Sequence, residues 1–338
     1  EDGSLSKPML AANSSFFTAE MGTATENKLI NMMNAYYNKG IKLNLWWMDA
    51  CWHTDFGFWK ADTNRFPTSL KAITDLAKSR NMSTMLWFEP EISGYNKTNC
   101  PKYSYDGDTL NPDWIIEGYA TTSGLNLMDM SNPDCVNFLL NRVTKAMEAS
   151  GVDIYREDMN YYPGADWTSF NTANPDRIGI FENLYLQGRY NFLDGLIEHF
   201  PGLIMDSCAS GGNRNDLESL RRAIICHRTD YYGYFNNDNA IKQSMTQGIT
   251  SWWPYTGTFT NAQNKYPEKY VLRSCITAFD TLLYNPETNL DFAVLRDWQE
   301  EWAKVTKYIY SDFYPLTTWS TEENAWCAWE YFNEDDEN

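Results

Sequence analysis

The 338-residue sequence has no long apolar run, and a membrane-spanning helix needs about 20 consecutive apolar residues, so the chain is not expected to cross a membrane. Residues 1–15 contain no basic region followed by an apolar stretch and do not resemble a signal peptide. Histidine is scarce, with three residues at positions 53, 199 and 227. Any proton transfer is therefore expected to depend on carboxylates.

The seven cysteines are scattered without CxxC spacing. An odd number without metal-ligand spacing argues against a disulfide framework and against a zinc site, and no cofactor is expected. Reduced cysteines favour a cytoplasmic location, with secretion as the alternative. The net charge of -18 argues against nucleic acid as a partner, because an acidic surface repels phosphate backbones.

Aromatic residues are abundant at 16%, including 14 Trp and 22 Tyr. Aromatic faces pack against the apolar C–H patches of sugar rings, while polar groups at the rim bind the hydroxyls. Trp46-Trp47, Trp52 and Trp252-Trp253 cluster near predicted strand ends. These clusters favour a sugar site, although a Trp-rich core is the alternative for any single one.

Short apolar runs alternate with helical patterns, which is typical of parallel βαβ units. Strands are predicted at 14–20, 42–49, 83–88, 152–157, 203–206, 223–226, 249–253 and 276–283, and helices at 26–37, 69–80, 182–199 and 293–309, with another beginning after Asn132-Pro133. Eight such strands predict an α/β fold, a (β/α)₈ TIM barrel over residues 1–320. A doubly wound sheet is disfavoured because no Gly-rich phosphate turn follows the first strand.

Two further segments carry predictions about organisation. Residues 92–124 are predicted to form a long irregular loop, and long loops in compact domains are usually functional. Residues 325–331 have the pattern of a strand that ends without a partner. We therefore predict that residues 321–338 begin a truncated C-terminal β-domain.

Acidic residues follow several predicted strands, and in a TIM barrel function lies at these ends. They are Asp49, Glu89, Glu91, Asp158, Asp206 and Asp230. A metal-dependent lyase or isomerase would use such carboxylates, among them Glu89, Glu91, Asp158 and Asp206, as ligands for a hard cation. A glycosidase would use two of them as nucleophile and acid/base. Spacing alone does not choose between these chemistries.

Four segments occur in an order that resembles the family 36 glycoside hydrolases, the α-galactosidase family. They are WWMDACW (46–52), LWFEPEIS (86–93), DIYREDMN (153–160) and SCASGGNRND (207–216), and NPDCVNFLLNRV (132–143) adds a fifth match. The resemblance implies a retaining, exo-acting hydrolase of terminal α-linked galactose or a galactose derivative. It would act through a covalent glycosyl-aspartate. It also implies flanking β-domains and a homo-oligomer in the full-length protein.

The same resemblance assigns roles to individual residues. It implies that Asp158 is the nucleophile and that Asp230, with Asp238 as a competing candidate, is the acid/base. It places Asp49 at the sugar's 4- and 6-hydroxyls, and Cys208 and Gly211 at its C2 substituent. Substrate contacts are also expected from Trp47, Trp87, Glu89, Arg156, Asn160 and Arg214. Arg156 and Arg214 would keep Asp158 ionised, and Tyr231 and Tyr232 would give Asp230 the less polar surroundings that an acid needs.

Three positions depart from the family pattern. Ala50 replaces a second sugar-binding aspartate, Arg156 replaces lysine, and Glu157 replaces an aromatic residue; Arg and Lys are not equivalent in positioning hydroxyls. An α-N-acetylgalactosaminidase or α-galactosaminidase is therefore an alternative, with Glu157 or Asp206 as a carboxylate that could pair with an amino sugar. A non-catalytic sugar-binding barrel is a further alternative.

Overall fold

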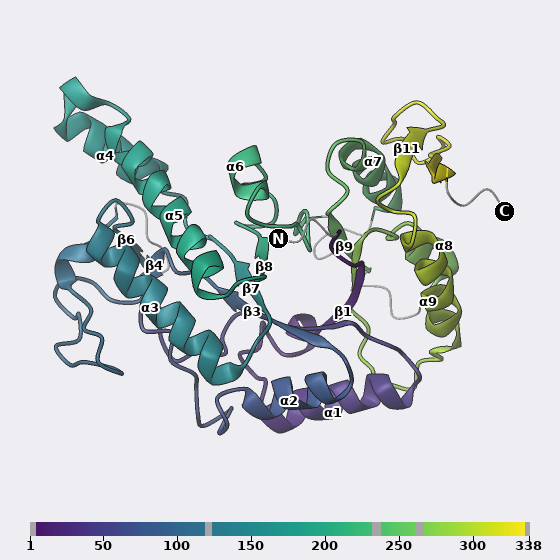
Figure 1. Cartoon of the computed structure of the whole chain (residues 1–338), viewed down its shortest axis with the longest axis horizontal. Helices are drawn as coiled ribbons and strands as arrows, with labels where there is room; N and C mark the ends of the chain where they lie inside the picture. The colour runs from purple at the N-terminus through teal and green to yellow at the C-terminus, as the bar shows by residue number, and fades with distance from the viewer. Residues whose placement is uncertain (1–4, 119–123, 232–237, 261–266, 335–338) are drawn as a thin grey trace.

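The computed structural model describes residues 5–118, 124–231, 238–260 and 267–334. Its main sheet has seven strands in the order β8-β7-β3-β2-β1-β10-β9, and every neighbouring pair is parallel. The strands are β1 (Met9–Asn13), β2 (Leu45–Met48), β3 (Ser83–Phe88), β7 (Ile154–Glu157), β8 (Ile204–Ser207), β9 (Gly257–Phe259) and β10 (Phe279–Leu282). Figure 1 shows this sheet curling inside a layer of helices.

A two-residue segment takes the place of the eighth strand. Ile224 bridges in parallel to Asp206 of β8, and Ile225 bridges in parallel to Thr256, just before β9. The Ser207 N–H donates to the Ile224 carbonyl at 2.9 Å, and the Ile225 N–H donates to the carbonyl of the residue before Thr256 at 3.1 Å. These bonds link the two edges of the sheet, so the predicted (β/α)₈ barrel is confirmed.

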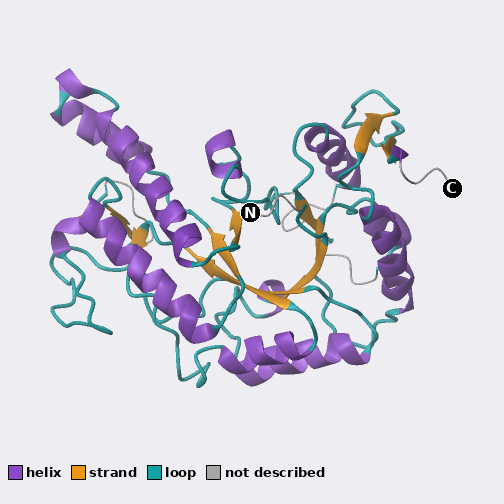
Figure 2. Cartoon of the chain, viewed as in Figure 1, coloured by secondary structure: helices purple, strands orange, loops and turns teal. Residues whose placement is uncertain are grey.

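The helices lie outside the sheet, as Figure 2 shows. They are α1 (Glu26–Asn38), α2 (Lys71–Ser79), α3 (Pro133–Ser150), α4 (Gly164–Ala173), α5 (Ile180–His199), α6 (Leu217–Leu220), α7 (Asn239–Thr250), α8 (Lys269–Arg273) and α9 (Ala293–Thr306). α3 begins as predicted, because the Asn132 side chain accepts a hydrogen bond from the Asp134 N–H and Pro133 occupies the first turn. No helix among the described residues is long and apolar enough to cross a membrane.

Alternation along the strands sorts side chains between two cores. Leu45, Trp47 and Met85 pack inside the barrel, while Trp46 and Leu86 pack between the sheet and the helices. The period of two also decides which side chains reach the site. Trp87 shares the parity of Met85, and Arg156 and Asp158 share the parity of inward-facing Ile154. The fold therefore aims polar groups from the ends of β3 and β7 into the barrel mouth.

Two predicted strands are wrong. The first strand is β1 at Met9–Asn13, and the predicted segment 14–20 contains a 3-10 turn at Ser15–Phe17 instead. All five β1 residues are buried, yet MLAAN lacks the β-branched residues that indicate a strand. The predicted strand 249–253 contains the end of α7, and the barrel strand is β9.

Two connections also differ from prediction. Within the segment predicted to be an irregular loop, β4 (Ile92–Ser93) and β5 (Ile115–Ile116) both pair antiparallel with β6 (Asn126–Met128). The closing strand has a partner, because β12 (Trp329–Phe332) pairs antiparallel with β11 (Asp312–Pro315). The truncated β-domain itself stays a prediction.

Candidate active site

A cavity of about 650 Å³ lies at the carboxyl ends of the barrel strands. Loops after most of the strands contribute to its wall, which contains Glu20, Asp49, Ala50, Cys51, Phe56, Trp87, Glu89, Arg156, Asp158, Asn160, Ser210, Thr229, Asp230, Tyr231 and Phe259. Among these described residues, five are carboxylic acids and a single one is a cation. The cavity is therefore acidic, with aromatic rings on part of its wall.

Asp158 is only 8% exposed, and several hydrogen bonds converge on its carboxylate. Its Oδ2 accepts from the Trp87 indole N–H at 3.0 Å and from the Asn160 amide at 2.9 Å. Burial by itself raises the pKa of a carboxyl, but the Arg156 charge and these donors outweigh burial and lower the pKa of Asp158 below its usual value. Asp158 is therefore an ionised carboxylate at neutral pH.

The loop after β8 directs its backbone at the other oxygen of Asp158. Oδ1 accepts from the N–H groups of Ala209 at 3.1 Å and Ser210 at 3.0 Å, and from Met159 at 2.8 Å. Ala209, Ser210 and Gly211 have φ angles of 84°, 48° and 89°. Left-handed backbone is unfavourable for residues with a Cβ, and such strain gathers at functional sites. Here it turns two consecutive N–H groups toward one carboxylate.

Arg156 forms the charged floor of the cavity. Its guanidinium bonds Asp206, which is fully buried, and lies 4.2 Å from the Trp47 ring centroid. Asp206 also accepts from the Cys226 N–H at 2.6 Å. Burial works against the charge on Arg156, but the surrounding anions, including Asp158, raise its pKa well above the usual value. A permanent cation therefore lies beside the ionised aspartate.

Asp230 lies in the same cavity in different surroundings. Burial, opposed by Arg156 and reinforced by Asp158, raises the pKa of Asp230 to about 6. His227 Nε2 lies 3.4 Å from Asp230 Oδ1, but burial lowers the pKa of His227 well below its usual value, so the imidazole is neutral. The competing candidate, Asp238, caps α7 by accepting from the Ile241 N–H at 3.1 Å and does not line the cavity. Tyr231 does line it, and Tyr232 lies outside the described residues.

Glu89 is a second acid with a raised pKa. It is 3% exposed, and burial followed by the Asp158 charge raises the pKa of Glu89 to about 8. It accepts from the Asn160 backbone N–H, and the Asn160 side-chain amide lies 3.5 Å from Glu89 Oε2. The Asn160 side-chain oxygen accepts from the Ser210 hydroxyl at 2.8 Å. Asn160 therefore connects Asp158, Glu89 and the loop after β8.

Four residues predicted to contact substrate do not line the cavity. Trp47 is fully buried beneath Arg156, and the Cys208 thiol is buried where the Gly211 N–H donates to it at 3.4 Å. A Cβ on Gly211 would lie 2.8 Å from the Asp230 N, so Gly211 permits a close backbone approach. Arg214 forms a bidentate pair with buried Glu91, with one bond of 2.9 Å. These four residues lie behind the cavity wall, and their contact with substrate stays a prediction.

Buried ion pairs also engage the carboxylates of two alternatives. Glu157 pairs with Arg189, Glu91 pairs with Arg214, and Asp206 pairs with Arg156. None of these three carboxylates lines the cavity. Glu157 and Asp206 are therefore not placed to meet an amino sugar. Glu91 and Asp206 are not free as metal ligands, and the described residues contain no group of three side chains suited to hold a metal ion.

Sequence reasoning missed Glu20, Cys51, Phe56 and Phe259 as cavity residues. Phe259 ends β9, which was predicted elsewhere, and its ring lies 5.2 Å from that of Trp47. Glu20 is the last residue of the first strand as it was predicted. An acidic residue at a predicted strand end was therefore a feature of the sequence that could have identified it. Correct bounds for β1 would have placed Glu20 in a loop after the strand, where functional residues of a barrel lie.

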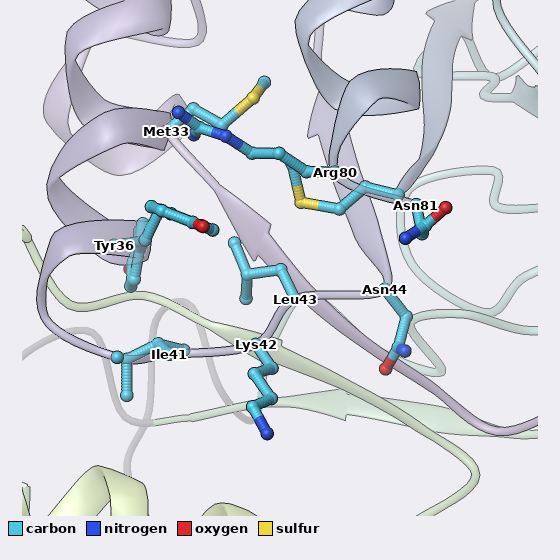
Figure 3. A pocket seen from close by; sticks show the side chains of 11 residues that line it. Met33, Tyr36, Ile41, Lys42, Leu43, Asn44, Arg80 and Asn81 are labelled. Atoms are coloured by element: carbon cyan, nitrogen blue, oxygen red, sulfur yellow. The ribbon is translucent and has the colours of Figure 1, made fainter.

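A second cavity, of about 460 Å³, lies near the amino ends of β2 and β3, where Figure 3 shows Tyr36, Leu43, Asn44 and Arg80 around it. Its described wall mixes apolar side chains with Lys42, Arg80 and two asparagines, and it contains no carboxylate. Residues at this face of a TIM barrel usually serve stability. The converging acids therefore identify the cavity at the carboxyl ends as the candidate site.

A barrel that places an ionised aspartate and an acid of raised pKa in one cavity has the pair of carboxyl groups that glycosidases use. The chain belongs to the Melibiase family, whose model matches residues 14–282. An α-galactosidase of Escherichia coli is 27% identical over 202 residues, covering 59% of this chain and 26% of that protein. α-Galactosidase Mel36A of Lactobacillus acidophilus is 22% identical over 317 residues, covering 86% of this chain and 40% of that protein. The chain thus spans well under half the length of these relatives.

Solved structures show the same fold. The family 36 α-galactosidase AgaA of Geobacillus stearothermophilus superposes with a TM-score of 0.72 at 18% identity, covering 92% of this chain and 44% of that chain. The α-galactosidase of Lactobacillus brevis superposes with a TM-score of 0.70 at 20% identity, covering 93% and 42%. These likenesses support the barrel assignment independently of the motifs.

Proposed function

We propose that the chain is the catalytic barrel of a retaining, exo-acting α-galactosidase-type glycoside hydrolase, with Asp158 as nucleophile and Asp230 as acid/base. The observation that carries the proposal is the opposite treatment of two aspartates in one cavity. Five N–H donors and Arg156 keep Asp158 ionised, whereas the pKa of Asp230 is raised to about 6. Double displacement needs one acid in each state.

The proposed reaction has two steps. A carboxylate oxygen of Asp158 attacks the anomeric carbon while Asp230 gives its proton to the departing glycosidic oxygen, so the sugar becomes an ester of Asp158. Asp230, now ionised, takes a proton from water, and that water attacks the anomeric carbon and releases Asp158. Arg156 offsets the charge of Asp158 in the free enzyme. The strained loop over residues 209–211 fixes the position of the nucleophile.

The proposed substrate is an oligosaccharide or glycoconjugate that ends in an α-linked galactosyl-type sugar. The support is family membership together with the names of the curated relatives, which are α-galactosidases. Structures of AgaA variants are in complex with stachyose, raffinose and 1-deoxygalactonojirimycin. The cavity of about 650 Å³ is in the size range of small-molecule sites.

An α-galactosaminidase is the second candidate, because the charge of the cavity favours it. Glu20, Asp49 and Asp158 line the cavity, and Arg156 is the one cation among its described residues. An ammonium group on the sugar would be attracted to such a site. Neutral galactosides need no such charge, so a comparison of the two sugars distinguishes the candidates.

The test is hydrolysis of aryl α-galactoside, α-N-acetylgalactosaminide and α-galactosaminide by the protein and by Asp158→Asn. The proposal expects galactoside turnover that falls by at least about 10⁴-fold in the variant, since a covalent step is lost. Preferred turnover of the galactosaminide would support the second candidate. Galactose binding without turnover of any substrate would instead identify a non-catalytic sugar-binding barrel.

A further inference from the structure

Glu20 and Asp49 line one cavity although they come from different strand loops. Ala50 also lines this cavity and offers it only a methyl group, so the loop after β2 contributes one carboxylate. Both acids face the same cavity, and burial and then the Asp49 charge raise the pKa of Glu20. Burial and then the Glu20 charge raise the pKa of Cys51. The loop after β1 thus supplies a second acid beside Asp49.

An unfavourable backbone presents Glu20. Ala19, Glu20 and Met21 have φ angles of 46°, 50° and 64°, all in the left-handed region that glycine prefers. The turn is held by hydrogen bonds from the Glu20 N–H to the Ser15 carbonyl at 2.9 Å and from the Met21 N–H to the Thr18 hydroxyl at 3.2 Å. Glycine would fit position 20 without strain. A glutamate is found there instead, which points to a role for its side chain.

Arg65 ties the two loops together. Its guanidinium donates to the carbonyls of Met21 at 2.5 Å and Ala24 at 3.3 Å in the loop after β1, and to the Cys51 carbonyl in the loop after β2. Asp62 holds the other edge of the guanidinium at 2.6 Å. The hydrogen bonds of Arg65 therefore hold the loop that contains Glu20 against the loop that contains Asp49.

We infer that Glu20 is a specificity-determining residue that, together with Asp49, accepts hydrogen bonds from hydroxyls of the sugar ring. Ionised carboxylates are acceptors only, and sugar hydroxyls are donors, so two carboxylates on adjacent loops match a polyhydroxylated ring edge. Charge-assisted bonds of this kind are the strong ones. The inference rests on the proposed function for the class of sugar, but it concerns binding and does not require turnover.

The test is binding of galactose and its 2-, 3-, 4- and 6-deoxy analogues, measured by NMR titration on the protein, Glu20→Ala and Glu20→Gly. The expected result is a loss of galactose affinity of about 10- to 100-fold in both variants, the range for a hydrogen bond to a charged group. One deoxy analogue lacks the hydroxyl that Glu20 binds. It should bind the unaltered protein about 10- to 100-fold more weakly than galactose does, and Glu20→Ala should not weaken its binding further. Glu198→Ala, at an exposed glutamate near the end of α5, should bind galactose normally.

Glu20→Gly is the control for misfolding. Glycine relieves the left-handed φ at position 20, so this variant should keep its melting temperature and still lose affinity for galactose. Unchanged galactose affinity in Glu20→Ala would overturn the inference, as would equal further losses for every deoxy analogue. Absence of galactose binding by the unaltered protein would overturn it too. Normal binding with the expected pattern but no hydrolysis of an aryl galactoside would remove the proposed function and leave the inference standing.

Discussion

Replacement of Trp87 by phenylalanine should shift the pH profile of activity through its effect on Asp158, the proposed nucleophile. The substitution keeps an aromatic ring beside Phe56 and Trp59 but removes the indole N–H that donates to Asp158 Oδ2 at 3.0 Å. A hydrogen bond to a charged group contributes about 1.5–3 kcal/mol, and one pKa unit corresponds to about 1.4 kcal/mol, so the pKa of Asp158 should rise by about one to two. The acid limb of kcat/KM should move upward by the same amount.

The same substitution changes stability with a defined sign. The pKa of Asp158 is lowered in the folded protein, so its contribution to stability is present above the unfolded value and is lost as pH falls through the folded pKa. Trp87→Phe should therefore lower the free energy of unfolding at neutral pH, with a smaller difference at acid pH. Urea unfolding at several pH values measures this.

Trp59→Phe is the matched control. Trp59 is equally buried, its ring lies 6.1 Å from that of Trp87, and its Nε1 has no acceptor among the described residues. The control loses similar apolar area but no bond to a carboxylate. The reasoning would be refuted if the acid limb stayed in place in Trp87→Phe, or if it moved equally in Trp59→Phe.

Three further predictions concern the rest of the site. Because the pKa of Asp230 is about 6 and the proposed mechanism requires its proton, kcat/KM should fall as pH rises through about 6. Asp230→Asn should lose this alkaline limb; a limb retained in the variant would assign it to another group. Gly211→Ala should lower the free energy of unfolding in urea by about 2–4 kcal/mol and lower kcat, because the added Cβ would meet the Asp230 backbone. Gly107→Ala, which has a similar φ but open space around it, should lower the free energy of unfolding by only about 1 kcal/mol. Equal losses in the two variants would contradict the close approach at Gly211. Arg214→Met should destabilise the protein by about 3 kcal/mol because buried Glu91 loses its bidentate partner and keeps only Arg189, at 4.0 Å. The folded protein should keep its KM; a large rise in KM would indicate that Arg214 contacts substrate.

Much of the site could be predicted because parallel strands end at one edge of a barrel. Asp49, Glu89, Asp158 and Asp230 follow four different strands or strand-like segments, and the fold brings all four to one cavity. Their convergence depends only on strand order and on chain direction, which hydrophobic alternation reveals. Errors of a few residues in strand bounds did not disturb it.

Side-chain orientation is what the motifs could not supply. Trp47 and Arg214 lie within matching motifs, but one packs inside the barrel under Arg156 and the other faces Glu91. Both orientations depend on partners distant in sequence. The loop over residues 209–211 is a further example. Its motif placed Gly211 at the sugar's C2 substituent but did not predict that the backbone N–H groups of Ala209 and Ser210 bind Asp158.

The fold errors have a different physical origin. β1 is short, buried and built from MLAAN, so it lacks both polar alternation and β-branched residues. β9 has only three residues. The apolar pair Trp252-Trp253, which precedes it, led to a strand being predicted at 249–253, where α7 ends. Very short buried strands are specified by the neighbours that they pair with, and a local pattern does not contain those neighbours.

The most direct test of the central claim is azide rescue of Asp158→Gly and Asp230→Gly with an activated aryl α-galactoside. If Asp158 is the nucleophile, azide takes its place in the first variant and the product is the β-galactosyl azide. If Asp230 is the acid/base, the second variant still forms the glycosyl-enzyme, and azide attacks that ester to give the α-galactosyl azide. These opposite products are the predicted result. Loss of activity without rescue in Asp158→Gly, or the same anomer from both variants, would contradict the assignment.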